Sequence, residues 1–376
     1  MGSMAFMFLP SSSDINPPEA SVPAGAAVLS PLSAYLCLAM LMPGANENTK
    51  AEFEKILGAD WDYVSALAAD IAAQLEKTGG STKLDLANSI WTDDDKAVIE
   101  EEWLKTVKAY FGPDIYSADL PSDGALKAIN KWVNDKTNGM IPKLHDENYD
   151  KDTIMVLLNA LYMKADWAHK FEGQDTYDRE FTKADGSTVT VPFMNMFEAY
   201  ESYIKTEDAE GIMLPYDDGR LAFIALKPGS GDARGYAASL TGAKLKEAIA
   251  AAKADTFVTV NMPKFDTEYS VYLTDALKAM GMTDAFDPFL ADLTGAGRGV
   301  DGPLYISYVF QRVKVDVNEE GTEAAAVTEI ATAERCALPA DEPIVLTFDK
   351  PFVYAIVDTE TGVPLFAGVM ENPEAK

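Results

Sequence analysis

The 376-residue sequence has only two cysteines, Cys37 and Cys336, and two histidines, His145 and His169. Two cysteines cannot build a disulfide framework or a four-cysteine zinc site. Neither histidine lies beside a G-x-S-x-G nucleophile motif, and we interpret both as ordinary surface residues. No phosphate-binding or calcium-binding loop is recognisable either. The sequence therefore implies no metal and no cofactor, and we expect a protein that is not an enzyme.

Basic charge and long apolar runs are also scarce. There are 31 lysines and arginines against 60 aspartates and glutamates, which gives a formal net charge of −29 at pH 7. Such a surface repels phosphate groups, so we expect neither nucleic acid nor an anionic membrane as a partner. Any charged partner should be basic, although such a charge often serves solubility alone. No apolar run approaches the ~20 residues that a membrane-spanning helix needs.

The apolar residues that are present, 48% of the chain, suffice for a large packed core. Helical patterns dominate the first 140 residues and strand patterns dominate the last third. This segregation predicts an α+β fold rather than a regular βαβ succession. Residues 1–27 are interpreted as a loose N-terminal segment. The expected helices are 31–41, 49–57, 63–75, 100–110, 124–137, 243–252 and 271–280, and the expected strands are 154–163, 188–192, 221–225, 256–262, 304–317, 344–348, 352–358 and 364–370.

A segment of small residues, 319–339, lies between two strand patterns. It has no aromatic side chain to anchor it in a core, which is typical of an exposed segment that proteases cut. From Thr322 to Thr332 the even-numbered residues are small or apolar, while Glu323 and Glu329 are odd-numbered. Because strand side chains alternate between faces, the segment could also enter a sheet with its even-numbered residues inward. Glu334 breaks this alternation, and an Ala-rich linker or short helix is the alternative.

The same segment resembles a motif of the serpin family. The run E-E-G-T-E-A-A-A at 319–326 is similar to the hinge of the reactive-centre loop in inhibitory serpins. Other motifs in family order cover about residue 28 to the end, among them S-P-L-S at 30–33, L-N-A-L-Y at 158–162, M-P-K-F at 262–265 and L-F-A-G at 365–368. The resemblance implies a single domain over 1–376, with the serpin fold of three β-sheets and about nine helices. It also implies a reactive-centre loop at 319–343, and we expect a bacterial source.

Inhibitory serpins are suicide substrates, and the resemblance implies the same activity here. A target serine protease cuts the loop and forms an acyl-enzyme, and the cut loop then inserts into the central sheet and traps the protease. We expect a secreted or cell-surface monomer, from which any signal peptide has been removed. The loop hinge implied by the resemblance is Glu319, Glu320, Gly321, Thr322, Glu323, Ala324, Ala325, Ala326, Val327 and Thr328.

The bond that the protease cuts lies at a nearly constant distance from the hinge glycine in the family. Counting from Gly321 places this bond between Arg335 and Cys336, and an arginine there suits a trypsin-like protease. A cut one or two residues later, after Cys336 or Ala337, would suit an elastase-like protease instead. The segment from Arg335 to Pro351 is longer than usual in the family, so both positions stay open.

Six further residues match family positions. The resemblance places Ser30, Ser33, Asn159 and Gln311 in a network where the sheet opens, and Trp167 and Lys264 in the breach at its top, where Lys264 could meet Glu319. Gln311 stands where many family members carry a histidine, so coupling to pH should differ. The rival function is that of a non-inhibitory serpin-like carrier or chaperone. The absence of proline from 322–328 favours inhibition.

Overall fold

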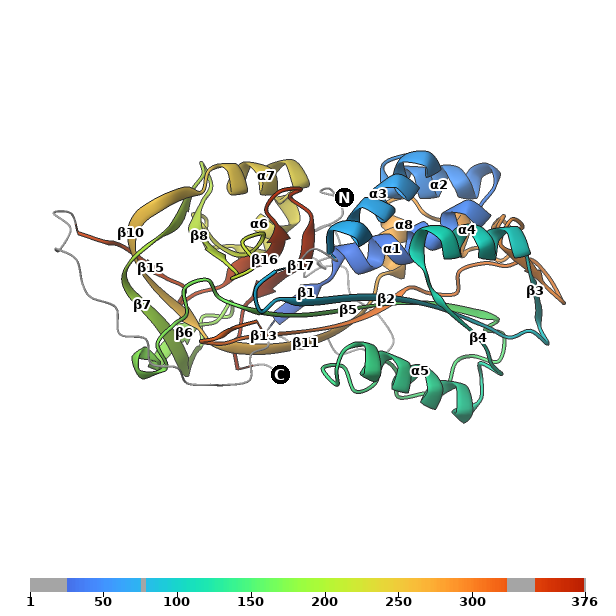
Figure 1. The fold of residues 1–376 in the computed structure, drawn as a ribbon, viewed down its shortest axis with the longest axis horizontal. Helices are drawn as coiled ribbons and strands as arrows, with labels where there is room; N and C mark the ends of the chain where they lie inside the picture. Colours follow the sequence, from blue (N-terminus) through green and yellow to red (C-terminus); the bar gives the residue numbers. More distant parts are fainter. Residues whose placement is uncertain (1–25, 76–78, 323–341, 375–376) are drawn as a thin grey trace.

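A computed structural model describes residues 26–75, 79–322 and 342–374 of the chain. The molecule is elongated, with most helices gathered at one end and a β-rich body at the other (Figure 1). Within the described residues there are eight α-helices, against about nine expected. They are α1 (Pro31–Leu41), α2 (Glu47–Leu57), α3 (Trp61–Leu75), α4 (Glu101–Phe111), α5 (Asp123–Lys136), α6 (Ala233–Ser239), α7 (Gly242–Ala250) and α8 (Thr274–Ala279).

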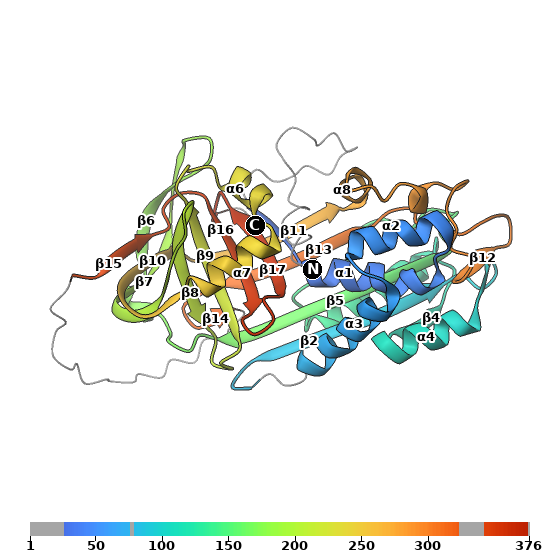
Figure 2. The same cartoon turned by 90° about the horizontal axis from the view of Figure 1, so that it is seen from above.

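A six-stranded sheet runs along the long axis and positions the site (Figures 1 and 2). The long strand β5 pairs with β2 on one side, and β13 pairs with β11 on the other. Within the described residues no ladder joins β5 to β13 directly, and only the two-residue strand β14 connects them. In spatial order the strands are β11 (Phe265–Tyr272), β13 (Phe310–Val317), β14 (Gly321–Thr322), β5 (Met155–Asp166), β2 (Lys83–Thr92) and β4 (Asp114–Ser117).

Two further sheets complete the fold, so the described chain has the three sheets that were predicted. A two-stranded ribbon pairs β12 (Gly297–Gly299) with β3 (Ala97–Ile99). The other sheet has nine strands and forms the β-rich body. Its order is β1 (Ala26–Leu29), β17 (Pro364–Met370), β16 (Phe352–Asp358), β9 (Leu221–Pro228), β8 (Ala209–Pro215), β7 (Thr188–Lys205), β10 (Lys253–Pro263) and β15 (Ile344–Thr347), with β6 (Tyr177–Thr182) paired to β7.

The strand β5 is covered on both faces, which explains its continuous apolar run. Its odd-numbered residues, such as Met163 and Ala165, belong to the main core, to which α1 also contributes. Its even-numbered residues Leu158 and Ala160 pack in a second cluster with Trp132 of α5. Figure 1 shows α5 on one face of the sheet and α1 to α4 on the other. The predicted strand at 154–163 is confirmed, together with its burial on both sides.

The other predicted elements all occur, with shifted bounds in several cases. Ser30 caps α1 as its side chain accepts a hydrogen bond from the Ser33 amide. The helix expected at 271–280 begins only at Thr274, since Tyr272 still pairs with Phe310 in the sheet. The strand expected from residue 304 begins at Phe310, and β7 continues far beyond the predicted 188–192. The ordered strand β1 includes residues 26 and 27, which the sequence placed in the loose segment.

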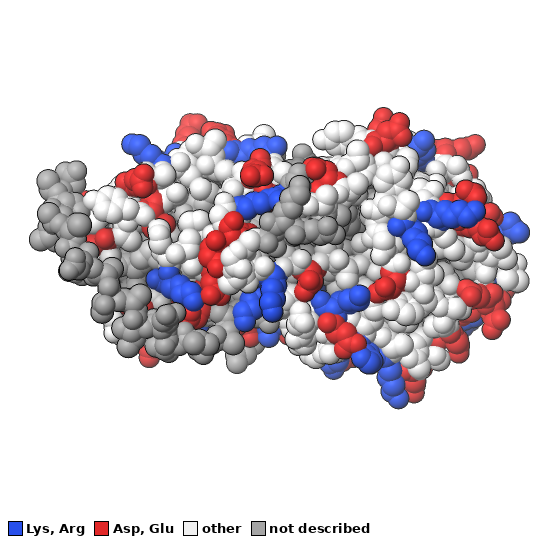
Figure 3. Space-filling view, viewed as in Figure 1, with Lys and Arg blue, Asp and Glu red and all other residues white. Residues whose placement is uncertain are grey.

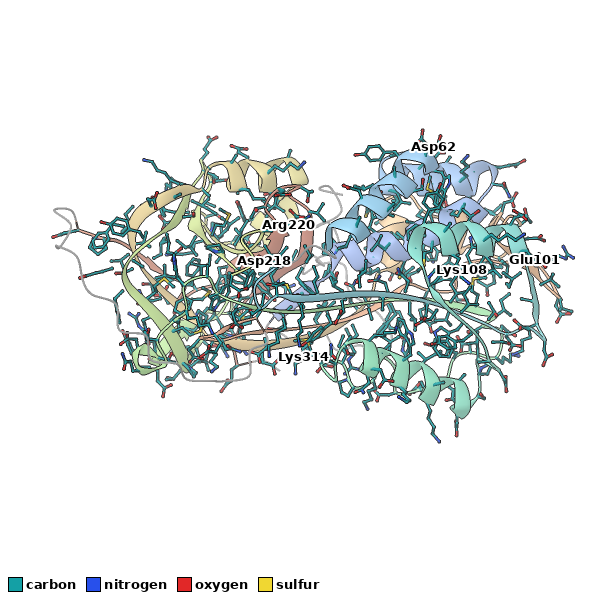
Figure 4. The ribbon with its side chains drawn as sticks, in the orientation of Figure 1. Asp62, Glu101, Lys108, Asp218, Arg220 and Lys314 are labelled. Carbon is teal, nitrogen blue, oxygen red and sulfur yellow. The ribbon has the colours of Figure 1, made fainter. Side chains whose placement is uncertain are left out.

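Charge is distributed without a basic patch on the face that Figure 3 shows, where acidic and basic side chains are interspersed. Some cations are paired in the interior. The Arg220 Nε atom lies 3.0 Å from Asp358 Oδ2, and Arg220 and Asp218 are labelled beside the β-rich body in Figure 4.

In the described ranges no helix has the length and apolar character needed to cross a membrane.

Candidate functional site

The site begins at β14, where Gly321 and Thr322 form a short strand between β13 and β5. Thr322 pairs with Val317 on one side and with Ala165 on the other, and Gly321 pairs with Asp166. A Cβ atom at Gly321 would lie 2.0 Å from the carbonyl oxygen of Ala165. Only glycine allows this close approach of two backbones. Gly321 and Thr322 of the expected hinge therefore already lie in the six-stranded sheet, between β13 and the end of β5.

The side chain of Thr322 points into the protein and is only 1% exposed. Its hydroxyl oxygen lies 2.6 Å from the hydroxyl oxygen of Tyr216, which is itself fully buried. The Tyr216 ring stacks on the Trp167 ring with a centroid separation of 4.7 Å. Thr322 is an even-numbered residue, so its inward orientation has the parity that the sequence predicted.

Trp167 also fixes the chain that leads into β14. Its indole N–H donates to the carbonyl oxygen of Asn318 at 2.9 Å, and its backbone N–H donates to that of Glu320 at 2.8 Å. The Phe171 N–H donates to the Glu319 carbonyl at 3.1 Å. Residues 318–320 are therefore held by one indole and two backbone hydrogen bonds from the segment that follows β5.

Two ion pairs hold the hinge carboxylates from outside. Lys264 Nζ lies 2.7 Å from Glu319 Oε2, and Lys170 Nζ lies 2.7 Å from Glu320 Oε2 and 3.0 Å from Asp166 Oδ2. Burial opposes the charge on Glu319. Hydrogen bonds from Lys264, the residue's own backbone amide and Thr176 outweigh that burial and hold the pKa of Glu319 below its ordinary value. The breach residues Trp167 and Lys264 thus both lie at the hinge.

The four residues expected in the sheet-opening network lie in two hydrogen-bonded pairs. The Gln311 amide accepts from the Ser30 N–H at 3.0 Å and donates to the Ser30 carbonyl at 2.9 Å. The Ser33 hydroxyl donates to Asn159 Oδ1. Asn159 also donates to Asn88 Oδ1 at 2.8 Å, which extends the network to β2. The network ties the start of α1 to both strands that border β14.

A space between β5 and β13 follows β14 along the sheet, and the network residues line this space. This smaller pocket measures about 50 Å³ and is bordered by Ser33, Asn159 and Gln311. A larger pocket of about 570 Å³ lies further along the sheet, away from β14, and is lined by Ile154, Leu158 and Phe310 among others. Because β5 and β13 share no ladder among the described residues, their facing edges carry backbone groups that another strand could pair with.

Part of the expected site lies outside the described residues, and part of the observed site was not expected from the sequence. The hinge residues Glu323 to Thr328 lie outside the described residues. The same holds for Arg335 and Cys336, which flank the bond expected to be cut. Sequence reasoning missed Tyr216, Asn88 and Lys170, because no local pattern connects them to the hinge.

His145 is half-buried and not the ordinary surface residue that the sequence suggested, whereas His169 is largely exposed. The His145 ring lies 4.4 Å from the Phe310 ring and 5.2 Å from the Tyr149 ring. Burial, followed by repulsion from Arg312, lowers the pKa of His145 to about 4. Its contacts come from residues that only the fold brings next to it.

Comparison with known proteins agrees with this geometry. The family model described as "Serpin (serine protease inhibitor)" matches residues 16–373. The human leukocyte elastase inhibitor is 33% identical over 363 residues, which cover 93% of this chain and 94% of that protein. An uncharacterized serpin-like protein of Thermococcus kodakarensis is 31% identical, over 92% of this chain and 80% of that protein. The crystal structure of the thermophilic serpin tengpin in its native state has a TM-score of 0.87 and 32% identity, and the match covers 99% of this chain and 92% of that chain.

These relatives come from a mammal and an archaeon, so they do not support the expected bacterial source. They do not support the expected secretion either. Both the family match and the named relatives support inhibition of serine proteases in general, with a protease as the partner. The match spans nearly the whole chain, and the solved relative shares the arrangement of helices and sheets. The chain belongs to the serpin family and has the serpin fold.

Proposed function

We propose that this protein is a suicide-substrate inhibitor of serine proteases, whose cut loop inserts between β13 and β5. The observation that carries the proposal is β14, since Gly321 and Thr322 already form the first two residues of such a strand. The facing edges of β5 and β13 below it have no ladder to each other in the described chain. Insertion would extend β14 along the gap between β5 and β13. It would give the backbone groups of both edges hydrogen-bond partners.

The register of β14 fixes where each following loop residue would lie. Both ladders are antiparallel, so each step forward from Thr322 is one step back from Ala165 and from Val317. Thr328, six steps on, would therefore lie between Asn159 (165 − 6) and Gln311 (317 − 6). Its side chain would face inward, as that of Thr322 does, toward the network around Ser33. A small residue with a hydroxyl group suits that polar place.

The same register explains the residue that breaks the alternation. Thr332 would lie opposite Met155, where β5 begins, so Glu334 would fall beyond the end of the strand. Glu329 would lie opposite Leu158 and Phe310, on the face that α5 covers. A carboxylate there would be costly to bury. We therefore infer that α5 or the chain that follows it shifts while the loop enters.

The proposed reaction begins as ordinary proteolysis. The protease serine attacks the carbonyl carbon of Arg335, the bond to the Cys336 nitrogen breaks, and that nitrogen takes up a proton as the new amine. The acyl-enzyme ester stays on Arg335. From Gly321 to Arg335 is 14 residue steps, about 46 Å in extended form. Insertion would carry the attached protease over a distance of this order before water hydrolyses the ester.

The target protease depends on the bond that is cut. Arg335 before Cys336 favours a trypsin-like protease, and a cut after Cys336 or Ala337 favours an elastase-like one. The similarity to the human leukocyte elastase inhibitor supports testing elastase beside trypsin. We further propose that the chain acts as a monomer and has no catalytic activity of its own. Secretion stays a prediction.

Denaturing gels test the proposal against its rival, a carrier or chaperone. The chain is mixed with trypsin and with elastase, and a covalent complex that survives detergent is expected with one of them. Mass spectrometry of the released C-terminal peptide would identify the bond. Clean cleavage without a complex, with the protease fully active, would exclude inhibition and favour the rival function.

A further inference from the structure

The outer face of β7, β10 and β15 carries exposed apolar side chains, at the end of the molecule away from α1 to α5 (Figures 1 and 2). Tyr200 of β7 and Phe257 of β10 are partners in the ladder, and their ring centroids lie 5.3 Å apart. Val345 of β15 pairs with Thr259, two residues beyond Phe257, and therefore points to the same face. Tyr200 and Val345 are 54% and 62% exposed.

A β-bulge in β7 adds one more aromatic side chain to this face. The register between β7 and β10 shifts between Val258 and Val260, and Phe197 and Glu198 lie in the irregular stretch of β7. The Glu198 N–H donates to the hydroxyl group of Thr259 at 3.2 Å, which places the bulge against the outer face. Glu198 has a φ of 52°, a left-handed conformation that is unfavourable for a residue other than glycine. Bulges and backbone strain of this kind concentrate at functional sites.

Exposed carboxylates lie beside these apolar side chains. We define the outer patch as the four apolar residues of this face, namely Phe197, Tyr200, Phe257 and Val345. Three exposed acidic residues each lie within three positions of a patch residue along the chain, namely Glu198, Asp255 and Glu342. None of these carboxylates forms an ion pair with another described residue, and the exposed Lys253 adds a single positive charge. The outer patch therefore suits an apolar surface that carries basic groups.

The position of the expected bond brings a protease to this face. Glu342 is the first described residue after the loop, and it follows Cys336 by six steps (342 − 336), at most about 20 Å in extended form. Thr322, on the other side, is thirteen steps from Arg335, about 43 Å. A protease domain of about 230 residues has a radius of gyration of about 17 Å, so its diameter exceeds the shorter span. A protease on the bond therefore meets the surface around β15, and a cut one or two residues later would bring it nearer still.

We propose that the outer patch binds the target protease before the bond is cut, through an apolar surface with basic groups beside the cleft of the protease. The proposal rests on the proposed function, because it assumes that a protease attacks the loop. Such a contact would speed capture and would select among proteases that accept the same residue in their cleft. Insertion would then carry the protease away, so the outer patch acts on capture and not on the lifetime of the covalent complex.

The probes for the test are trypsin and elastase whose catalytic serine is replaced by alanine, because these bind the loop without cutting it. In calorimetric titrations, Tyr200→Ser/Val345→Ser should weaken the binding of at least one protease about tenfold. The matched control is Tyr63→Ser/Val300→Ser. Tyr63 and Val300 are 62% and 66% exposed, but they lie in α3 and directly after β12, at the opposite end of the molecule (Figure 2). The control should bind as the parent chain does.

The charges of the patch have a test of their own. In Glu198→Gln/Asp255→Asn/Glu342→Gln, raising the salt concentration from about 0.05 M to 0.5 M should weaken binding less than it does in the parent chain. Melting temperatures of all variants should stay within about 2 °C of the parent chain, since the changed side chains are largely exposed.

No measurable binding of either inactive protease, an unchanged affinity in the double variant, or an equal loss in the control would overturn the proposal. A dimer that Tyr200→Ser/Val345→Ser dissociates in sedimentation experiments would also overturn it, since a second copy would then cover the patch. The active proteases separate the two claims. Binding of the inactive forms without a covalent complex from the active ones would contradict the proposed function and leave the outer patch supported.

Discussion

The hydroxyl oxygen atoms of Tyr216 and Thr322 lie 2.6 Å apart in the interior, beside the stacked ring of Trp167. This contact restricts which side chains can occupy position 322, the second residue of β14. The place accepts a small side chain that makes one hydrogen bond, and it excludes water. A larger or charged side chain at position 322 would have to displace Tyr216 or leave the sheet.

Thr322→Arg should convert the inhibitor into a substrate. An arginine without a partner at this buried place costs several kcal/mol, so the loop would enter slowly and the protease would hydrolyse the ester first. We expect the moles of inhibitor needed per mole of protease to rise at least about tenfold by titration of residual activity. Glu323→Arg is the control, because the alternation places residue 323 on the opposite face. An equal rise in both variants would contradict the inward orientation of the even-numbered residues.

Glu329→Ala should make inhibition more efficient. The register of β14 places residue 329 against Leu158 and Phe310, where a carboxylate is costly. Its removal should speed insertion and reduce the share of inhibitor that is lost as cleaved product. The complex and the cleaved chain are quantified on denaturing gels after reaction with trypsin. A larger cleaved fraction in the variant than in the parent chain would show that Glu329 does not oppose insertion.

Lys264→Met should destabilise the hinge at neutral pH. The folded-state pKa of Glu319 is lowered, so its contribution to stability is present above the unfolded value of about 4.5 and is lost as the pH falls through the folded value. Lys264 is partly exposed, and we expect a melting temperature lower by only about 1–3 °C at pH 7. The difference from the parent chain should shrink as the pH falls below 4.5 and through the lowered pKa of Glu319. Lys50→Met, at the exposed pair with Glu54, is the control and should change little.

His145→Phe should remove one source of acid sensitivity. The folded pKa is about 4 and the ordinary value 6.5, so the unfolded chain binds a proton between these values that the folded chain does not. Stability from this group therefore falls as the pH decreases from 6.5 to 4, by at most about 3 kcal/mol. Urea unfolding at pH 7 and at pH 4 measures the loss. A variant that loses as much stability as the parent chain would contradict the lowered pKa of the half-buried His145.

The sequence predicted those parts of the fold that local patterns determine. The apolar run at 154–163 predicted a strand covered on both faces, and the alternation after Gly321 predicted the inward side of Thr322. The contact of Thr322 with Tyr216 could not be predicted, because the two residues are 106 positions apart and no local pattern joins them. The surroundings of His145 depend in the same way on Phe310, which only the fold brings to it. The pocket likewise arises from α1, β5 and the chain before β13 together.

The structure of the chain cut by trypsin would show whether the cut loop continues β14 in its present register. We expect Thr328 between Asn159 and Gln311, with Thr332 opposite Met155 at the end of β5. A cut loop that lies outside the sheet, or a strand shifted by one residue so that Glu329 faces inward, would contradict this expectation.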